Sequence, residues 1–233
     1  NWNTSIVHRA FLVSDLKEGK AGRRQVRWFK NQTPKDIEVF PPRWHSPSGL
    51  LHDPVTPEIK TQDESLGGSL RLHSPRYERA DHLGNALHAY YAALPALAGT
   101  DRKLQVKYAE RGISSWKVTD LTTGPELVDS GDRLVHWIRN RWPNAEILTE
   151  VPLEGPRAGG GRWRGNADML IRKGGDILAL IDHKTTGGAK GNGSAVEVHI
   201  PQLLAYREAL GSDKVSLWMH LPLSGIMVQV TGP

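Results

Sequence analysis

The sequence predicts an α/β fold, with one central mixed β-sheet flanked by helices. Two observations support this prediction: some segments carry apolar residues at helical spacing, and others are short, apolar and bounded by turn residues. From residue 131 onward the order is helix, three strands, helix, two strands, which is typical of a sheet with helices on its faces. A chain of 233 residues is long enough to bury a core without disulfides.

The first two helices are predicted from apolar spacing and end signals. Residues 76–97 have apolar side chains at helical spacing, with Pro95 as the weak point of the pattern. A second helix is expected over 131–142, with Ser130 as its N-cap and Pro143 as its stop.

Three strands are expected next. Residues 145–153 are extended in character, and residues 162–173 and 176–184 form a hairpin across the turn Lys173-Gly174-Gly175-Asp176.

The C-terminal part completes the sheet. A helix is expected to begin at Pro201, which suits the first turn, and to run through Leu210. Two further strands are expected over 214–221 and 226–232, on either side of residues 222–225.

The N-terminal part differs from the rest in charge and in proline content. Residues 1–50 carry nine basic and four acidic side chains, whereas residues 165–233 carry six of each. Five prolines between Pro41 and Gly68 favour a connector over packed helix or strand. Because the chain begins with Asn1, we expect it to be part of a longer protein.

The composition excludes several classes of site. With no cysteine, the chain has no disulfide scaffold, cysteine-ligated zinc, iron–sulfur cluster or thiol nucleophile, so His, Asp and Glu are the expected metal ligands. No apolar run approaches ~18 residues and the N-terminus lacks the apolar core of a signal peptide. We therefore expect a soluble, cytoplasmic protein with no membrane partner. The net charge of +5 is compatible with a nucleic-acid partner.

The hairpin carries the residues that suggest chemistry. With a turn of about three residues, Asp168 falls opposite Asp182, and Lys184 shares their face because side chains alternate along a strand. Hard oxygen ligands of this kind suit Mg²⁺ or Mn²⁺. The alternative is a strand-end salt bridge between Asp182 and Lys184, with Asp168 solvated near the turn.

Four short motifs follow one another in a fixed order. They are Gly84-x3-His88, Gly165-x2-Asp168, Asp182-x-Lys184 and Gln202-x3-Tyr206. This ordered set resembles the RecB-like branch of the PD-(D/E)xK nuclease superfamily. The resemblance covers about residues 46–231, because Ser46-Pro47-Ser48-Gly49-Leu50 is similar to the entry motif of that domain. It divides the chain into a basic N-terminal extension and connector, 1–45, and a nuclease domain, 46–233.

The resemblance implies a restriction-endonuclease-like core and a role for each motif residue. Implied metal ligands are His88, Asp168, Asp182 and the backbone carbonyl of His183, around one or two Mg²⁺ or Mn²⁺ ions. Implied catalytic residues are Lys184, with Asp182 and Asp168, Glu150 as an acidic residue that assists the metal site, and Gln202 and Tyr206, which position the DNA phosphate or the active-site network.

The chain departs from the family pattern at three places. The middle residue of the Asp182-x-Lys184 triplet is usually apolar, but here it is His183, whose side chain is expected to pack on the opposite face. Asp182 stands where many relatives have Glu. The iron–sulfur members need four cysteines, which this chain lacks.

The missing cysteines point to the cluster-free kind found at the C-terminus of UvrD-like or AddA-type helicase-nucleases. The implied activity is DNA hydrolysis in bacterial double-strand-break processing and repair, with DNA and a UvrD-like helicase motor as partners and a location at the nucleoid. No G-x4-G-K-[ST] motif is present, as expected for an isolated nuclease domain.

Basic and aromatic residues around the hairpin are candidate DNA contacts. Arg162, Trp163 and Arg164 precede Asp168, and Lys190 lies in the glycine-rich segment 185–195. The alternative for each Arg–Trp pair is that the Trp packs while the Arg extends to solvent.

Two other functions compete with the nuclease. One is a catalytically silent copy of the fold that binds DNA or docks a partner helicase, and the complete catalytic set argues against it. The other is a stand-alone restriction-type endonuclease, which needs a target-recognition segment that residues 1–40 do not resemble.

Overall fold

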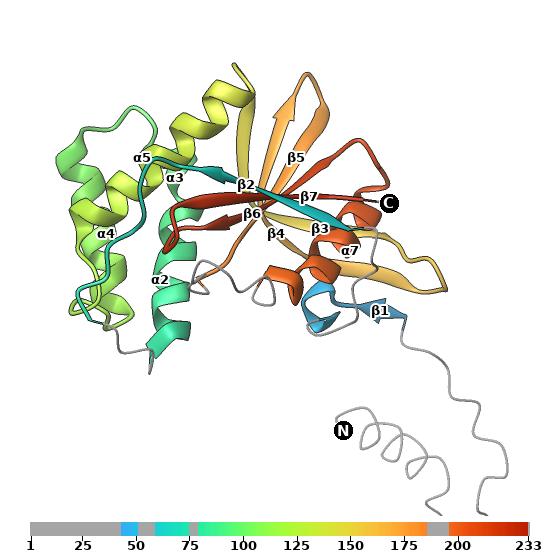
Figure 1. Ribbon diagram of the computed structural model, residues 1–233, viewed down its shortest axis with the longest axis horizontal. Helices are drawn as coiled ribbons and strands as arrows, with labels where there is room; N and C mark the ends of the chain where they lie inside the picture. Colours follow the sequence, from blue (N-terminus) through green and yellow to red (C-terminus); the bar gives the residue numbers. More distant parts are fainter. Residues whose placement is uncertain (1–42, 51–58, 75–78, 186–195, 233) are drawn as a thin grey trace, which may run out of the picture. The chain divides into compact units, whose positions relative to one another are not determined.

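The computed structural model describes residues 43–50, 59–74, 79–185 and 196–232 (Figure 1). They belong to one compact unit of the chain, Pro41–Pro233. Among these residues no helix is both long enough and apolar enough to cross a membrane.

A seven-stranded mixed sheet forms the centre of this unit, as predicted. Six strands follow the order β1-β4-β5-β6-β7-β2, and β3 pairs with β4. The β1–β4 and β5–β6 pairs are parallel and the others antiparallel. The strands are β1 (Trp44–His45), β2 (Lys60–Ser65), β3 (Glu146–Pro156), β4 (Arg162–Lys173), β5 (Asp176–His183), β6 (Ser216–Leu221) and β7 (Ile226–Thr231).

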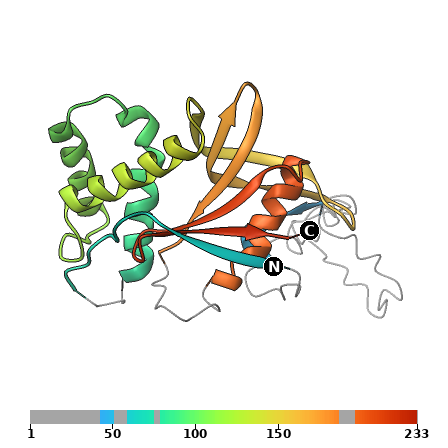
Figure 2. The same ribbon diagram turned by 45° about the horizontal axis from the view of Figure 1, so that its top comes forward.

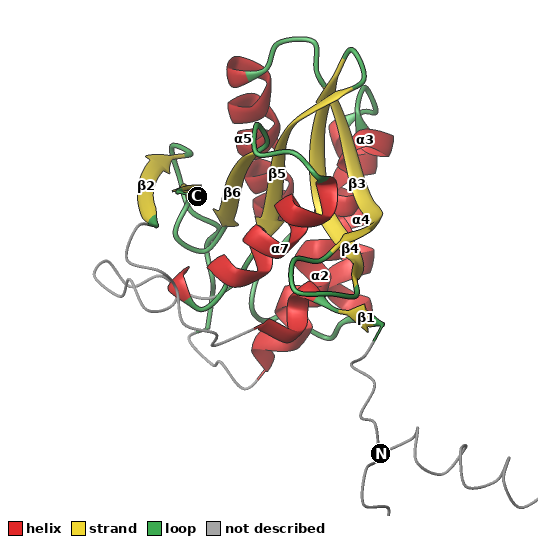
Figure 3. Ribbon diagram, turned by 90° about the vertical axis from the view of Figure 1, so that its right-hand side faces the viewer, coloured by secondary structure: helices red, strands yellow, loops and turns green. Residues whose placement is uncertain are grey.

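Helices cover the sheet in two groups. They are α2 (Ala80–Ala92), α3 (Leu94–Leu97), α4 (Arg102–Ser115), α5 (Gly124–Arg141) and α7 (Ile200–Leu210), with a short 3₁₀ turn, η1, at Pro47–Leu50. Figures 1 and 2 show α2, α4 and α5 together and α7 apart from them. Figure 3 shows α7 lying across β4 and β5. The two predicted aspartates, Asp168 and Asp182, lie between these two groups, on β4 and β5.

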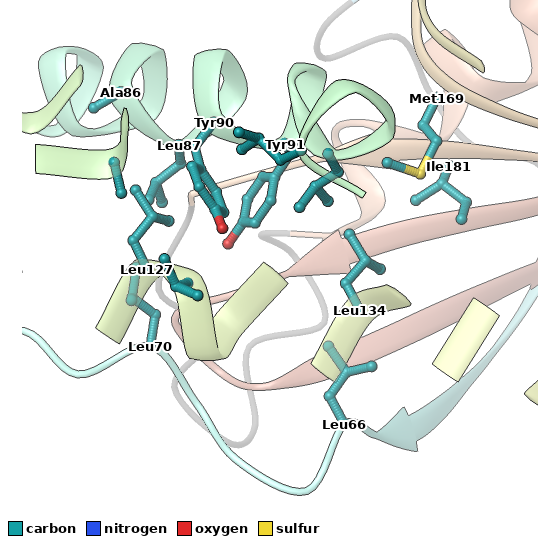
Figure 4. Close-up of a cluster of buried hydrophobic side chains, with 14 of the residues drawn as sticks. Leu66, Leu70, Ala86, Leu87, Tyr90, Tyr91, Leu127, Leu134, Met169 and Ile181 are labelled. Atoms are coloured by element: carbon teal, nitrogen blue, oxygen red, sulfur yellow. The ribbon is translucent and has the colours of Figure 1, made fainter. Parts of the chain in front are cut away.

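The larger core cluster joins the sheet to α2 and α5. Tyr91, Leu134, Met169 and Ile181 are all fully buried in it (Figure 4). A second cluster packs α7 against the opposite face, with Leu203 as a fully buried member. Because both faces of the sheet are covered, β5 is buried along most of its length.

The helical predictions need three corrections. The segment 76–97 divides into α2 and α3 before Pro95, and α4 was not predicted, because its long charged stretch hides a narrow apolar stripe. Helix α5 begins at Gly124, capped by Thr123 and Glu126 in a capping box. Ser130 is therefore not the N-cap: it lies inside the helix and bonds to the Tyr91 hydroxyl at 2.9 Å.

The prediction of a proline-rich connector between Pro41 and Gly68 is also wrong in part. Within it, β1 pairs with β4, η1 packs against α7, and β2 pairs with β7 along its whole length. β2 consists of polar residues, and Lys60 through Asp63 are exposed, so it lacks the apolar alternation by which strands are recognised. Its backbone pairing with β7, and no apolar pattern of its side chains, places it in the sheet.

In the hairpin, Asp168 lies opposite Asp182 as predicted, but the turn is shorter than expected and a bulge sets the register. Only two residues, Gly174 and Gly175, form the turn, both with positive φ as a type I′ turn requires. That turn alone would place Asp168 opposite Ile181. A bulge at Leu178 adds one residue to β5 and restores the register in which Asp168 faces Asp182.

Candidate active site

The two acidic residues of the hairpin meet where β4 loses its partner. β3 pairs with β4 along nearly its whole length, so β1 and β5 share the other edge of β4 and leave residues 164–168 there unpaired. Asp168 lies at the end of this gap and accepts a hydrogen bond of 2.8 Å from the backbone N–H of His183. Asp182 is almost completely buried beside it, with its side chain 2% exposed.

Glu150 lies opposite Asp168 in the β3–β4 register and has a strained backbone. Its φ is 51°, a left-handed value that costs a non-glycine residue of order 1–3 kcal/mol and is common at functional sites. At this point the regular alternation of side chains between the two faces of the sheet is interrupted in both β3 and β4. On β4, Met169 packs on the α2 side, whereas Ala167 packs on the α7 side although it is only two residues away. The inversion directs the Glu150 and Asp168 carboxylates toward the same space.

Helix α2 adds a nitrogen ligand to the two carboxylates. One ligand atom each from His88, Glu150 and Asp168 lies within 4.8 Å of the others, and His88 Nδ1 is 3.5 Å from Asp168 Oδ2. Burial lowers the pKa of His88, which leaves the ring neutral and able to bind a cation. Burial and the neighbouring Asp182 raise the pKa of Asp168 to about 8, so without a cation this carboxyl holds a proton.

Lys184 begins a polar chain that extends into helix α7. Its Nζ lies 2.8 Å from Asp182 Oδ2 and donates to Gln202 Oε1 at 3.1 Å. Gln202 Nε2 lies 3.4 Å from the Tyr206 hydroxyl, which donates to the backbone carbonyl of Asn166 at 2.7 Å. Gln202 and Tyr206 are one helical turn apart, so α7 holds the Lys184 ammonium in place from its buried face.

Two glycines of the predicted motifs allow these elements to approach. A Cβ on Gly84 of α2 would lie 3.2 Å from Thr185 Oγ1, next to Lys184. A Cβ on Gly165 would lie 3.2 Å from the Tyr206 ring and 3.1 Å from Pro47. Each glycine lacks a side chain where an element passes close to the polar chain that begins at Lys184.

The His183 side chain points away from the carboxylates. It is buried, and its Nδ1 lies 3.0 Å from His220 Nδ1. The Tyr91 ring packs on both histidines, at centroid distances of 4.8 and 5.0 Å. The backbone of His183 thus faces Asp168 while its ring belongs to the core, as the alternation along β5 predicts.

The donor set fits a hard divalent cation. It combines carboxylate oxygens with a neutral imidazole, the ligands that Mg²⁺ and Mn²⁺ accept. Asp182 Oδ2 is buried and makes no hydrogen bond of good geometry, although the Lys184 ammonium lies beside it. That oxygen therefore keeps a lone pair, although Asp182 is not one of the three residues whose ligand atoms lie within 4.8 Å of one another.

The predicted DNA contacts do not share one environment. Trp163 is only 4% exposed, and its indole donates to Glu208 on α7 at 2.8 Å, so its prediction as a surface contact is wrong. Strand alternation turns Arg162 and Arg164 the other way, toward solvent. Lys190 lies outside the described residues.

The arrangement of sheet, histidine, carboxylates and lysine agrees with a comparison to known families. Residues 65–230 match the family profile of the PD-(D/E)XK nuclease superfamily. The chain belongs to this superfamily. Its members are in general metal-dependent nucleases, which gives the donor cluster and Lys184 a common chemical context.

Comparisons with individual proteins add little to this. A solved structure, titled "Crystal structure of SSO0001", is similar at 23% identity over 62% of this chain, with a TM-score of 0.31. The match covers 66% of that chain, slightly less than two thirds. No curated protein matches the sequence.

Sequence reasoning missed one part of the site and one core contact behind it. The Asn166 carbonyl, which accepts the Tyr206 hydroxyl at the end of the polar chain from Lys184, is a backbone group, so no residue type indicates it. In the core, His220 lies in an apolar strand far along the chain, and only the β5–β6 register places it beside His183.

Proposed function

We propose that the chain is a Mg²⁺- or Mn²⁺-dependent DNA nuclease that hydrolyses phosphodiester bonds. One observation carries the proposal: the donor cluster of His88, Glu150 and Asp168 lies next to a buried Asp182–Lys184 pair. Carboxylates and an ammonium concentrated in one place suit a reaction in which a phosphate must be bound and its charge neutralised.

His88, Glu150, Asp168 and Asp182 would hold one or two cations, together with the backbone carbonyl of His183. A divalent cation held there supplies Lewis-acid chemistry toward a phosphate oxygen and a water molecule. The raised pKa of Asp168 means that this carboxyl exchanges a proton for the cation, so loading is favoured as the pH rises toward about 8.

The Lys184 ammonium is held in a defined position by its neighbours. Asp182 and Gln202 hold its ammonium on two sides, which leaves N–H groups for the substrate. From there it orients the attacking water or donates to a phosphate oxygen as negative charge develops. Gln202 and Tyr206 act through Lys184, since their bonds fix its position.

The biological setting follows from the resemblance of the motifs to the cluster-free RecB-like branch. We place the domain in a bacterial helicase-nuclease that processes double-strand breaks, next to a UvrD-like motor in the same polypeptide or complex. A catalytically silent copy of the fold is the competing function, and the unbroken set from His88 to Lys184 argues against it.

A cleavage assay tests the proposal. Single-stranded, linear duplex and circular DNA, and a matched RNA, are incubated with the protein and Mg²⁺ or Mn²⁺. We expect metal-dependent cleavage of DNA. Lys184→Ala and Asp182→Ala should each lower the rate by about 100-fold or more.

The matched controls are Lys214→Ala and Asp63→Ala, which remove the same charges at exposed positions away from the site. Both should cleave like the wild type. Cleavage of RNA alone would contradict the DNA assignment. Binding of DNA without cleavage under either metal would favour the silent copy.

A further inference from the structure

An exposed tryptophan surrounded by arginines lies at the end of the unpaired segment of β4. Trp44 is 38% exposed. The guanidinium groups of Arg43, Arg162 and Arg164 lie 5.5, 6.0 and 5.9 Å from the centre of its ring. We call these four residues the Trp44 platform. It is independent of the catalytic residues, none of which belongs to it.

The platform arises from the pairing of two strands. Trp44 is opposite Arg162 in the parallel β1–β4 register, and Arg164 is two residues further along the same face of β4. Arg162 also pairs with Glu154 at 3.1 Å, whereas within the described residues Arg43 and Arg164 have no carboxylate partner. Like charges gathered round one ring repel one another, so a polyanion would relieve this repulsion.

A pocket of about 570 Å³ connects the platform to the catalytic chain. Arg164 belongs to both the platform and the pocket wall, and the wall continues through Asn166 to Tyr206. The Ser46 and Ser48 hydroxyls, 2.7 Å apart, line it at the start of η1. Arg164 and Asp168 are four residues apart on one strand, about 13 Å, which is a span of a few nucleotides.

We propose that the Trp44 platform and this pocket bind an unpaired nucleic-acid strand on its way to the carboxylates. A base stacks on the part of the indole that the arginines leave exposed, Arg43 and Arg164 pair with phosphates, and the following nucleotide occupies the pocket. Stacking requires an unpaired base, so the site selects single-stranded ends over blunt duplex. As a route to the catalytic centre, this inference rests on the proposed nuclease function.

The test measures binding without cleavage. Fluorescence anisotropy of a labelled oligothymidylate is recorded in metal-free buffer with the full chain. We expect Trp44→Ala to weaken binding about 5-fold to 100-fold, and Trp44→Phe to retain most of the affinity, because a ring remains for stacking. Arg164→Ala should weaken binding and lower the salt dependence of log K by about 0.7.

Trp116→Ala is the matched control, since Trp116 is also 38% exposed but lies at the end of α4. It should bind like the wild type, as should Arg139→Ala for the arginine variant. Equal affinities for Trp44→Ala and Trp116→Ala would overturn the site. So would equal displacement of the oligonucleotide by polyglutamate of matched charge, which would show that charge alone is recognised.

Two further measurements separate this proposal from the nuclease itself. Thermal unfolding of each variant shows whether lost binding reflects lost folding, and Trp44→Phe keeps the test valid if the alanine variant unfolds. If the protein cleaves DNA normally and Trp44→Ala binds DNA like the wild type, the platform proposal is refuted and the nuclease proposal stands. If Trp44→Ala binds DNA more weakly but the wild-type protein cleaves nothing, the nuclease proposal is refuted and the platform proposal stands.

Discussion

Glu150 is the residue at which backbone strain and charge coincide. Its left-handed φ of 51° interrupts β3 at the point where the strands exchange faces, and its carboxylate joins the donor cluster. A residue kept in an unfavourable conformation at a site is expected to serve function at some cost in stability.

Replacing Glu150 by glycine should separate these two effects. Because glycine adopts positive φ freely, we expect Glu150→Gly to raise the free energy of unfolding by about 1 kcal/mol in metal-free buffer. The same change should weaken Mn²⁺ binding and cleavage by about 10-fold or more. Urea unfolding and a metal titration measure the two quantities.

Glu146→Gly is the control, because Glu146 is an exposed residue of the same strand without a positive φ. It should lose stability and keep metal binding. A loss of stability in Glu150→Gly as large as in Glu146→Gly would show that the φ of Glu150 carries no strain.

The buried histidine pair predicts how stability depends on pH. Burial lowers the pKa of His220 to about 3 and the pKa of His183 well below 6.5. Unfolding exposes both rings, whose pKa returns to about 6.5. The unfolded chain therefore binds more protons below about pH 6.5, and stability falls as the pH decreases from there toward about 3. Each ring contributes about 1.4 kcal/mol per pH unit below about pH 6.

His220→Asn tests this pH dependence, since an amide can still bond to His183 but does not titrate. Urea unfolding at about pH 7, 6 and 5 should show a slope that is smaller by one proton than in the wild type. Asp168, with its raised pKa, contributes with the opposite sign in the same range, but it is present in both proteins and cancels in the comparison. Identical slopes would mean that His220 is protonated in the folded protein.

At the scale of elements, β3 and α7 are held closer together than side chains normally allow. A Cβ on Gly155 of β3 would lie 2.1 Å from the backbone oxygen of Ala209 on α7. This approach brings Gln202 and Tyr206, on the same helix, into bonding distance of Lys184 and Asn166. A single glycine of β3 therefore allows α7 to hold the polar chain that runs from Lys184 to the Asn166 carbonyl.

Gly155→Ala should displace α7 and damage both stability and catalysis. We expect a loss of about 3 kcal/mol or more in the free energy of unfolding, because the clash is with backbone that cannot move aside. The rate of cleavage should fall further than the folded fraction explains.

Gly112→Ala provides the contrast, since nothing lies within 4 Å of its Cβ position in α4. Gly112→Ala should raise the free energy of unfolding by about 1 kcal/mol, because alanine has the higher helix propensity. A Gly155→Ala protein with wild-type stability would mean that β3 and α7 do not touch as described.

At the scale of the whole molecule, metal binding should be visible as stability. A cation that binds only the folded chain, at about 100 times its Kd, adds about 2.7 kcal/mol to the free energy of unfolding. For a protein of this size the Tm should rise by about 5–10 °C, which differential scanning fluorimetry with Mn²⁺ measures.

Asp168→Asn should lose this response without losing stability in metal-free buffer. The amide resembles the protonated carboxyl and can still accept the N–H of His183. Asp63→Asn, an exposed acidic residue of β2, should keep the full response. A Tm rise in Asp168→Asn equal to that of the wild type would place the cation elsewhere.

Much of this organisation was predictable from local signals. The type of fold, the hairpin strands and α7 follow from apolar patterning, proline and glycine, because these act over a few neighbouring residues. The motif residues from His88 to Tyr206 were singled out by the resemblance of their order and spacing to a known family, and the structure brings His88 close to Asp168 and Lys184 close to Gln202. β2 was not predicted because its side chains are polar and show no apolar alternation. α4 was not predicted because its many charged residues hide a narrow apolar stripe.

The order of residues along the chain is enough to say which chemical groups are available: carboxylates, imidazoles and a lysine, and no thiols. Which of these groups lie close together depends on how the strands and helices pack. The bulge at Leu178 aligns Asp168 with Asp182, the inversion at Glu150 adds a third carboxylate, and the β5–β6 register pairs His183 with His220. Trp44 rather than Trp163 faces solvent because of the strand pairing on β4. Register and packing depend on contacts between segments far apart in the chain, and no local pattern of residues encodes such contacts.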